Sequence, residues 1–108
     1  MDKLRALQYF VAAADEGSFA GAARRLDVSV PSIHKLIGAL ETQLGIRLFE
    51  RTARGLTLTS NGDIYFESCQ LLLEELEALD TAVSRSASSP SGTLLVGAHP
   101  QLAHHFLL

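Results

Sequence analysis

Residues 18–49 constrain the fold of this 108-residue chain most strongly, because they contain two helical patterns with almost nothing between them. An alanine-rich helix is expected over residues 19–26, and a polar break, Asp27-Val28-Ser29, ends it. A longer helical pattern begins directly after the break. Two helices joined by so short a turn form a helix-turn-helix, whose second helix is shaped to enter the major groove of DNA.

Capping residues predict the bounds of the helices around this break. Apolar residues recur at spacings of three and four from Leu4 to Ala14, which indicates a first helix that ends at Gly17. Ser18 is the expected N-cap of the second helix, and Ser29 is the expected N-cap of the third. Pro31 then falls in the first turn of the third helix, where its missing N–H does no harm. The inward stripe of the third helix is Ile33, Ile37, Leu40 and Leu44, and Gly45 ends it.

Two short alternating segments follow the third helix. Residues 47–51 and residues 56–59 alternate polar and apolar side chains, as half-buried strands do. The segment Thr52-Ala53-Arg54-Gly55 lies between them and is expected to form a turn. A hairpin placed directly after a recognition helix makes a winged helix. We therefore expect a mainly α fold, with three helices and a β-hairpin wing followed by a long helix.

The long helix is expected over residues 61–85, with Ser60 and Asn61 as candidate caps. Six of its side chains are spaced four, three, four, three and four apart, which is the a/d pattern of helices that pair with one another. Part of this seam is expected to pack against the first helix of its own chain, and the remainder against a partner helix. The predicted dimer interface is Tyr65, Cys69, Leu72, Leu76, Leu79 and Val83.

Composition changes after the long helix. Residues 86–92, Ser-Ala-Ser-Ser-Pro-Ser-Gly, are a low-complexity segment typical of a hinge. Residues 93–97 then have the pattern of a first strand. We expect a winged helix-turn-helix DNA-binding domain over residues 1–60, a linker and dimerisation helix over 61–85, a hinge over 86–92, and the beginning of a second domain over 93–108.

Charge is distributed unevenly along the chain, although the net charge is only −3. Residues 1–60 carry eight Lys or Arg and six Asp or Glu, a net of +2, whereas residues 61–108 carry one and six, a net of −5. An anionic partner is therefore expected to meet the first half of the chain. No apolar run approaches the roughly 18–20 residues that span a membrane, and a lone cysteine fits a reducing compartment. We expect a cytoplasmic protein without membrane contact.

Several short motifs follow one another in a distinctive order. They are Leu7-x-x-Phe10, Gly17-Ser18-Phe19, Ala22-Ala23-x-x-Leu26, Val28-Ser29-x-Pro31, Ala39-Leu40-Glu41, Leu44-Gly45, Leu48-Phe49-x-Arg51, Thr57-x-Thr59 and Gly62. Together they resemble the N-terminal region of LysR-type transcriptional regulators, over nearly the whole chain. The resemblance implies sequence-specific DNA binding in bacteria, dimerisation through the long helix and, usually, tetramers with an effector-binding domain.

Gly92-x-Leu94-x-Val96-Gly97 resembles the start of that effector-binding domain. Residues 93–108 are therefore expected to be a truncated beginning of it, and no small-molecule response is expected from the 108 residues alone. The recognition helix departs from the common family pattern Ser-Gln-Pro-Ala-Val-Ser-Arg-Gln-Ile. Here Val30 lacks the hydrogen-bonding groups of Gln but fits a thymine methyl, and His34 and Lys35 stand in place of Ser and Arg. We infer a changed or relaxed sequence preference.

The predicted partner is double-stranded DNA with a partial palindrome, bound through the second helix, the third helix and the hairpin turn. Capping and helix initiation are alternative roles for Ser29, Pro31 and Ser32, and a structural role is the alternative for Arg51. The predicted DNA-contacting residues are Ser18, Arg24, Ser29, Val30, Pro31, Ser32, His34, Lys35, Arg51, Thr52, Arg54 and Gly55.

A competing hypothesis is an interaction protein that pairs through the long helix with a full-length relative and blocks it. An enzyme is not expected, because no nucleophile–base pair, paired carboxylates or phosphate-binding glycine loop stands out. No cofactor is expected either. His99, His104 and His105 are considered as metal ligands, but no cysteine or carboxylate accompanies them at ligand spacing, so no metal site is expected.

Overall fold

A computed structural model describes residues 1–88 of the chain. Its contacts divide the chain into two units, Met1–Leu73 and Glu74–Leu108, which are described separately. Residues 89–108 lie outside the described part. The predictions made for the hinge beyond residue 88, for the second domain and for the three C-terminal histidines therefore concern residues outside it.

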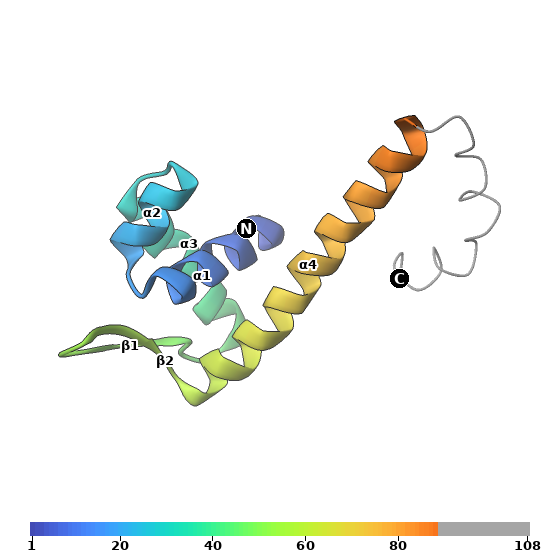
Figure 1. Ribbon diagram of the computed structural model, residues 1–108. Helices are drawn as coiled ribbons and strands as arrows, with labels where there is room; N and C mark the ends of the chain where they lie inside the picture. The colour runs from blue at the N-terminus through green and yellow to red at the C-terminus, as the bar shows by residue number, and fades with distance from the viewer. Residues whose placement is uncertain (89–108) are drawn as a thin grey trace. The chain divides into compact units, whose positions relative to one another are not determined.

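Three helices form the first part of the Met1–Leu73 unit (Figure 1). They are α1 (Lys3–Glu16), α2 (Phe19–Leu26) and α3 (Val30–Leu44), and the predicted caps end or begin each of them. Ser18 Oγ accepts a hydrogen bond from the Gly21 N–H at 2.9 Å, and Gly17 and Gly45 adopt left-handed conformations with φ of 71° and 72°. The helix-turn-helix and its short turn are therefore confirmed.

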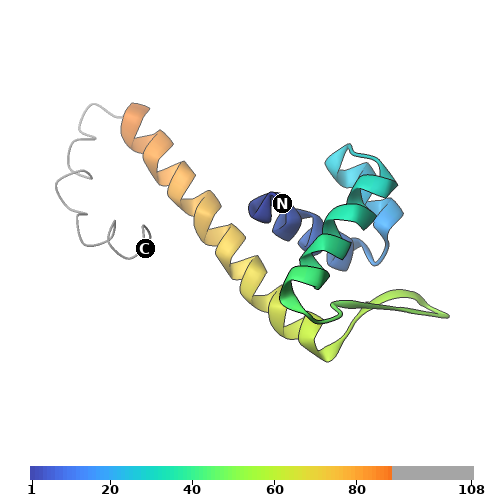
Figure 2. The ribbon, with the colours of Figure 1, turned by 180° about the vertical axis from the view of Figure 1, so that it is seen from behind.

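A small core of apolar side chains holds these helices together. Its largest fully buried members are Phe10, Ile33, Leu40 and Leu48, which come from α1, from α3 and from the segment before the hairpin. Ala22 and Ala23 are buried in α2, and such small side chains allow α2 to lie close to its neighbours. Seen from behind, α3 runs from beside α2 to the base of the hairpin (Figure 2).

The hairpin consists of β1 (Phe49–Thr52) and β2 (Gly55–Leu58), paired antiparallel with Phe49 opposite Leu58. The first strand was expected over 47–51 and begins two residues later. Arg47 and Leu48 are not part of the ladder because other groups satisfy their backbone: Glu41 Oε2 accepts from the Leu48 N–H at 2.7 Å, and Thr59 Oγ1 donates to the Arg47 carbonyl at 2.7 Å. Backbone groups already bonded elsewhere do not require strand pairing.

The long helix α4 (Ser60–Ser88) starts earlier and ends later than the predicted 61–85. Its cap is Thr59 rather than Ser60 or Asn61. Thr59 Oγ1 accepts from the Gly62 N–H at 2.9 Å, and the Thr59 carbonyl accepts from the Asp63 N–H at 2.9 Å. The Thr59 N–H also donates to the Leu48 carbonyl at 3.0 Å, so all the polar groups of Thr59 are bonded. This residue joins the hairpin to α4.

The first four turns of α4 complete the core of the Met1–Leu73 unit. The Phe10 ring lies 5.5 Å from the Tyr65 ring and 6.3 Å from the Phe66 ring, measured between centroids. Cys69 is buried and Leu73 is half-buried against the same core. Gly62 is required here, because a Cβ on it would run into the backbone carbonyl of Leu48. Within residues 1–88, no helix has the length and apolar character needed to cross a lipid bilayer.

Candidate nucleic-acid interface

The N-terminal turn of α3 is exposed and is fixed by serine side chains. Ser29 Oγ accepts from the Ser32 N–H at 3.2 Å and lies 2.7 Å from Ser32 Oγ, while Pro31 occupies the first turn. The capping role considered for these residues is therefore present in the structure. Pro31 has no N–H, and the Ser32 and Ile33 N–H groups are bonded to Ser29, so this exposed turn offers an anion the two hydroxyl groups and the Val30 N–H.

Val30, His34 and Lys35 are exposed on α3, whereas Ile33 and Ile37 of the same helix are buried. Val30 is an exposed apolar side chain, with 36% of its surface accessible. Apolar contact with a thymine methyl needs such a side chain on the exposed side of a recognition helix. The outer side of α3 therefore presents a methyl-bearing side chain, an imidazole and an ammonium group together.

Phe19 lies between His34 and Arg51 and contacts both. The Phe19 and His34 rings are 4.3 Å apart between centroids, with an edge-to-face angle of 66°. The guanidinium carbon of Arg51 lies over the Phe19 ring, 5.6 Å from its centroid. Arg51 therefore has the structural role considered for it, because the Phe19 ring attracts a cation that lies over its face. Phe19 was not among the predicted site residues, and no periodicity links it to residues 34 and 51.

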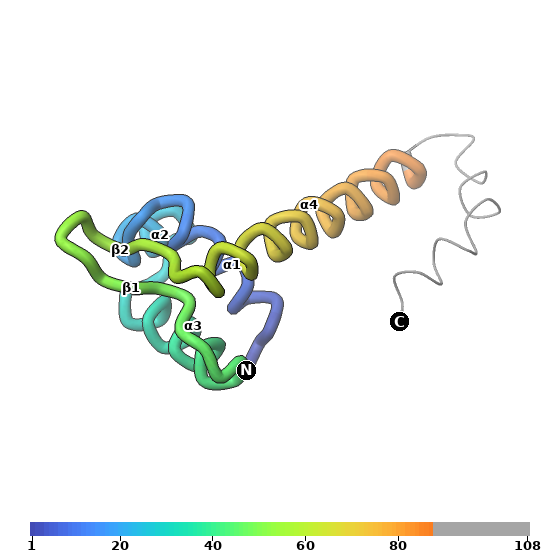
Figure 3. Tube along the Cα trace, turned by 90° about the horizontal axis from the view of Figure 1, so that it is seen from below, coloured from blue at the N-terminus to red at the C-terminus, as the bar shows by residue number. Residues whose placement is uncertain are grey.

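A concave surface lies between the N-terminus of α2, the start of α3 and the hairpin. Ser18, Phe19, Val30, His34, Arg51 and Thr52 are among the residues that line it. Figure 3 shows β2 on the side of the α1–α2 turn and β1 on the side of α3. We call this surface the α3–wing groove. It brings together six of the twelve predicted DNA-contacting residues, which are Ser18, Val30, His34, Arg51, Thr52 and Gly55. Arg54 lies in the adjoining hairpin turn and is not part of the lining.

The hairpin turn is closed by its own side chains. Thr52 Oγ1 donates to the Gly55 carbonyl at 3.3 Å and accepts from the Arg54 N–H at 3.2 Å, so this hydroxyl stabilises the turn. Gly55 adopts φ of 114°, a conformation that L side chains rarely adopt. Arg54 is exposed at the turn and points a cationic side chain outward from a rigid base.

Arginines of α2 differ in their partners. Arg25 Nη1 lies 3.2 Å from Asp15 Oδ2 and 3.6 Å from Glu16 Oε2, so its charge is shared with two carboxylates at the end of α1. Arg24, the predicted contact residue, is exposed next to it. Of these two arginines, Arg24 is the one whose guanidinium remains available to bind an anionic ligand.

Glu41 fixes the path of the chain from α3 into the hairpin. Its Oε2 accepts hydrogen bonds from the Leu48 and Phe49 N–H groups at 2.7 and 3.3 Å and lies 3.7 Å from Arg47 Nε. Hydrogen bonds to an ionised acceptor are shorter and stronger than those between neutral groups. The carboxylate thereby sets the position of the hairpin relative to α3.

The structure divides the predicted dimer seam of α4. Tyr65 and Cys69 pack into the core of their own chain, whereas Leu72, Leu76, Leu79 and Val83 are exposed. Ile64 and Leu71 are exposed beside them, at 69% and 59% of their surfaces, and were not predicted. Ile64 and Leu71 lie outside the a/d row of the other four, so the heptad spacing did not predict them.

Burial changes the ionisation of the two seam residues in the core. It raises the pKa of the Tyr65 phenol, and the charge and hydrogen bonding of Cys69 add to the rise. It also raises the pKa of the Cys69 thiol, which the Tyr65 hydrogen bond and the Lys3 ammonium partly oppose. Both groups are therefore held in their neutral forms near pH 7. No group of three His, Cys, Asp or Glu side chains gathers as metal ligands within residues 1–88.

Residues 4–63 match the family of "Bacterial regulatory helix-turn-helix protein, lysR family". The chain is 45% identical over 92 residues to the HTH-type transcriptional regulator TfdS of Cupriavidus pinatubonensis, which covers 85% of this chain and 30% of TfdS. It is 33% identical over 107 residues to the HTH-type transcriptional activator AaeR of Escherichia coli, which covers 99% of this chain and 35% of AaeR. The chain thus spans less than half the length of these relatives.

Solved structures with the same arrangement include two DNA complexes. The complex of the BenM DNA-binding domain with catB site 1 DNA matches with a TM-score of 0.77 and 36% identity, covering 82% of this chain and 98% of that one. The complex of the CbnR DNA-binding domain with DNA matches with a TM-score of 0.69 and 42% identity, covering 82% of this chain and 100% of that one. Since the family match spans more than half of the chain, this protein belongs to the LysR family of bacterial regulatory helix-turn-helix proteins.

Proposed function

We propose that this chain is the DNA-binding part of a bacterial transcriptional regulator and that it acts in the cytoplasm, without catalytic activity of its own. The observation that carries the proposal is the α3–wing groove, where the exposed N-terminus of α3 lies beside Arg51 and His34. The similarity of the chain to the BenM and CbnR DNA-binding domains, both solved with DNA, supports the proposal. Basic side chains and helix N-termini hold the DNA backbone, and the outer side of α3 reads base edges.

The proposed contacts divide into two groups. Ser18, Arg24, Arg54 and the cap residue Ser29 meet phosphates, because they present cations or hydrogen-bond donors without a base-reading geometry. Val30, Ser32, His34 and Lys35 lie on the outer side of α3 and sample the bases. Thr52 and Gly55 support the turn that carries Arg54.

Selection of bound duplexes from a random DNA pool at two salt concentrations tests this proposal. A specific regulator enriches a site with two-fold symmetry, and its binding weakens steeply with salt. Binding without any enriched site contradicts the assignment of a sequence-specific regulator and favours the interaction-protein hypothesis.

Removal of charge tests the contacts themselves. Lys35→Ala with Arg54→Ala is expected to weaken binding to the selected duplex, and the loss of the Arg54 phosphate contact is expected to lower the salt slope by about 0.9. The matched control is Lys3→Ala with Arg5→Ala, which removes the same charge from α1, outside the α3–wing groove. If both double variants bind DNA equally well, the assigned interface is wrong.

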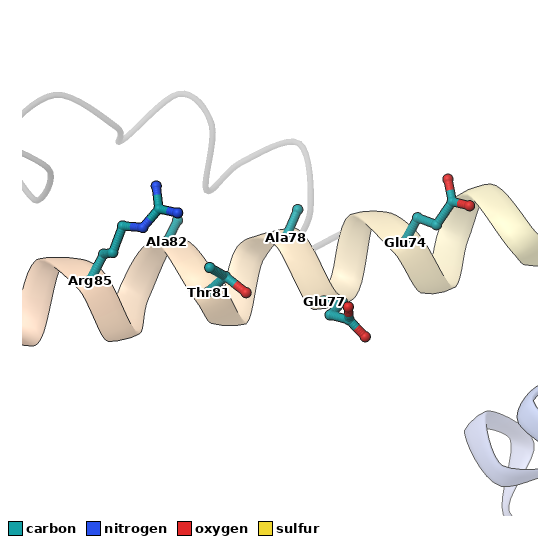
Figure 4. Close-up of a pocket in the computed structure, with 6 residues that line it drawn as sticks. All are labelled: Glu74, Glu77, Ala78, Thr81, Ala82 and Arg85. Atoms are coloured by element: carbon teal, nitrogen blue, oxygen red, sulfur yellow. The ribbon is translucent and has the colours of Figure 1, made fainter.

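We further propose that two chains associate through the exposed apolar residues of α4. The carrying residues are Ile64, Leu71, Leu72, Leu76, Leu79 and Val83, because they leave apolar surface accessible in one chain. Figure 4 shows the neighbouring surface of the same helix, where Glu74, Ala78 and Ala82 point to one side and Glu77 points away. Glu74 and Glu77 lie on other sides of α4 than Leu72, Leu76 and Leu79, whose a/d spacing is typical of a paired helix.

Sedimentation of the chain across a concentration series tests this association. A dimer that dissociates on dilution supports the proposal, and a monomer at every concentration contradicts it. Mixing the chain with a full-length family member tests the competing hypothesis, since an interaction protein forms a mixed dimer and binds DNA weakly by itself.

A further inference from the structure

A row of aromatic rings extends from the core of the Met1–Leu73 unit to the α3–wing groove. Phe10 in α1 is fully buried, and its ring centroid lies 5.3 Å from that of Phe49 in β1. The Phe49 ring lies 5.7 Å from the Phe19 ring, nearly perpendicular at 85°. The Phe19 ring in turn lies 4.3 Å from the exposed His34 imidazole. Each ring therefore packs against the next one in the row, from the buried Phe10 outward to His34.

The Phe19 ring is the last member of this row that belongs to the core. It is half-buried, and it carries no group that can hydrogen-bond to a base or a phosphate. It contacts two exposed polar side chains from different elements, the His34 imidazole of α3 and the Arg51 guanidinium of β1. Phe19 can therefore affect a bound ligand only through the positions of the His34 and Arg51 side chains.

We propose that Phe19 is a positioning residue for DNA readout and that His34, held by it, is a specificity-determining residue. The proposal rests on the DNA-binding function proposed above. Phe19 fixes the imidazole of His34 toward a base edge while it keeps the Arg51 guanidinium against the DNA backbone. An acceptor such as guanine N7 or O6 is the partner that an imidazole N–H fits.

The physical advantage is that the readout group is ordered before DNA arrives. An exposed side chain that must be immobilised on binding loses conformational freedom, which weakens the complex. Edge-to-face packing on Phe19 removes much of that loss, because the imidazole already lies in one orientation. Specificity benefits most, since a base edge offers hydrogen bonds in only a few directions, whereas a phosphate is contacted from many.

A double-mutant cycle on the full chain tests the coupling. The variants are Phe19→Leu, His34→Ala and the two together, and the probes are the duplex selected by the unmodified chain and a scrambled duplex of the same composition. Phe19→Leu is expected to weaken binding to the selected duplex about tenfold and to the scrambled duplex no more than about twofold. In the His34→Ala background, Phe19→Leu is expected to weaken binding to the selected duplex no more than about twofold, as on the scrambled duplex, because only the contact to Arg51 is left to lose.

Two further variants separate positioning from folding. Phe19→Tyr keeps the ring and is expected to bind the selected duplex like the unmodified chain. Phe19→Met keeps most of the buried volume without the ring, so it replaces Phe19→Leu if thermal unfolding shows that Phe19→Leu is unfolded. Its expected losses on the two duplexes are the same as those of Phe19→Leu.

The outcomes distinguish the two proposals. If losses from Phe19→Leu and His34→Ala add, or if both duplexes lose affinity equally, Phe19 supports only the fold and the positioning role is overturned. If the unmodified chain selects no duplex at all, the DNA-binding function fails first. Selection by the unmodified chain together with a coupled cycle supports both.

Discussion

The Met1–Leu73 unit and the rest of α4 show two different ways for a helix to be stable. Helices α1, α2 and α3 each bury one side against a shared core that includes Phe10, Ile33 and Leu40. Between Glu74 and Arg85, by contrast, every side chain is exposed, including Leu76, Leu79 and Val83. The same chain therefore contains helices fixed by their own core and a helical segment that lacks one.

This difference indicates where stability depends on other molecules. Isolated helices shorter than about 12–15 residues are marginal in water, and most helical stability in proteins comes from packing. The winged helix-turn-helix has that packing within the chain. The stretch of α4 after Leu73 is expected to gain it from a second chain. Substitutions confined to one region therefore test whether the two regions depend on different contacts.

Removal of the central aromatic ring is expected to have the largest effect. Phe10→Ala deletes a fully buried ring that contacts Phe49, Tyr65 and Phe66. The free energy of unfolding is expected to fall by about 3–5 kcal/mol, as for other buried aromatic truncations. Urea denaturation followed by circular dichroism measures the loss. A change below about 1 kcal/mol would mean that the core is not the source of stability in this unit.

Loss of the Glu41 carboxylate is expected to come next. Glu41→Ala leaves the buried Leu48 N–H without its acceptor, which costs about 1.5–3 kcal/mol for a hydrogen bond to a charged group. Amide hydrogen exchange at Leu48 and Phe49 should accelerate more than exchange in α1. Glu50→Ala removes an exposed carboxylate from β1 and is the control. Equal effects of the two substitutions would argue against a special role for Glu41.

Two glycines in helices are expected to respond in opposite directions to alanine. A Cβ at Gly62 runs into the Leu48 carbonyl, and such overpacking destabilises by about 1–3 kcal/mol. A Cβ at Gly38 meets nothing within 4 Å, so Gly38→Ala gains up to about 1 kcal/mol from helix propensity. Thermal unfolding of both variants, at one protein concentration, checks the signs. Destabilisation by Gly38→Ala would show an unrecognised neighbour on the outer side of α3.

A charged side chain among the exposed apolar residues of α4 is expected to prevent association of two chains without changing the stability of the winged helix-turn-helix. Leu76→Glu should change the unfolding of the winged helix-turn-helix by less than about 0.5 kcal/mol, because the side chain is exposed in one chain. It should nevertheless abolish association in sedimentation. Thr81→Glu, on another side of the same helix, is the control and should associate normally. Unchanged association of the Leu76 variant would rule out these apolar residues as the interface.

The smallest effect concerns the reactivity of Cys69. Burial raises the pKa of its thiol, so the folded chain holds less thiolate at pH 8 than the unfolded chain does. Alkylation by iodoacetamide is therefore expected to be at least about tenfold slower in buffer than in urea. Equal rates in the two solutions would mean that this turn of α4 opens readily and does not belong to the stable unit.

Local signals in the sequence were sufficient for the helix-turn-helix. Ser18, Ser29, Gly17 and Gly45 cap the helices where their chemistry predicts, because capping depends on neighbours three or four residues away. The start of β1 was misplaced because a carboxylate from α3 and a hydroxyl after β2 bond the backbone of residues 47–48. Such bonds join distant segments, and no local pattern contains them.

The candidate site was predictable to the same extent. The helical period accounts for Lys35, which it turns away from the buried Ile33 and Ile37. It places Val30 and His34 beside Ile37, at the edge of the buried side, although both are exposed. The support that Phe19 gives to His34 and Arg51 did not follow, because the three side chains come from three different elements. The division of the seam was also hidden, since Tyr65 and Leu72 have the same heptad spacing but only Tyr65 reaches the core.

Thr59 gives the wing and the long helix a common point of failure. Its hydroxyl and backbone complete the end of the hairpin and the start of α4 with the same few hydrogen bonds. A displacement of Thr59 therefore removes the cap of α4 and also frees the Arg47 and Leu48 carbonyls beside the wing. Neither element can lose this residue without weakening the other.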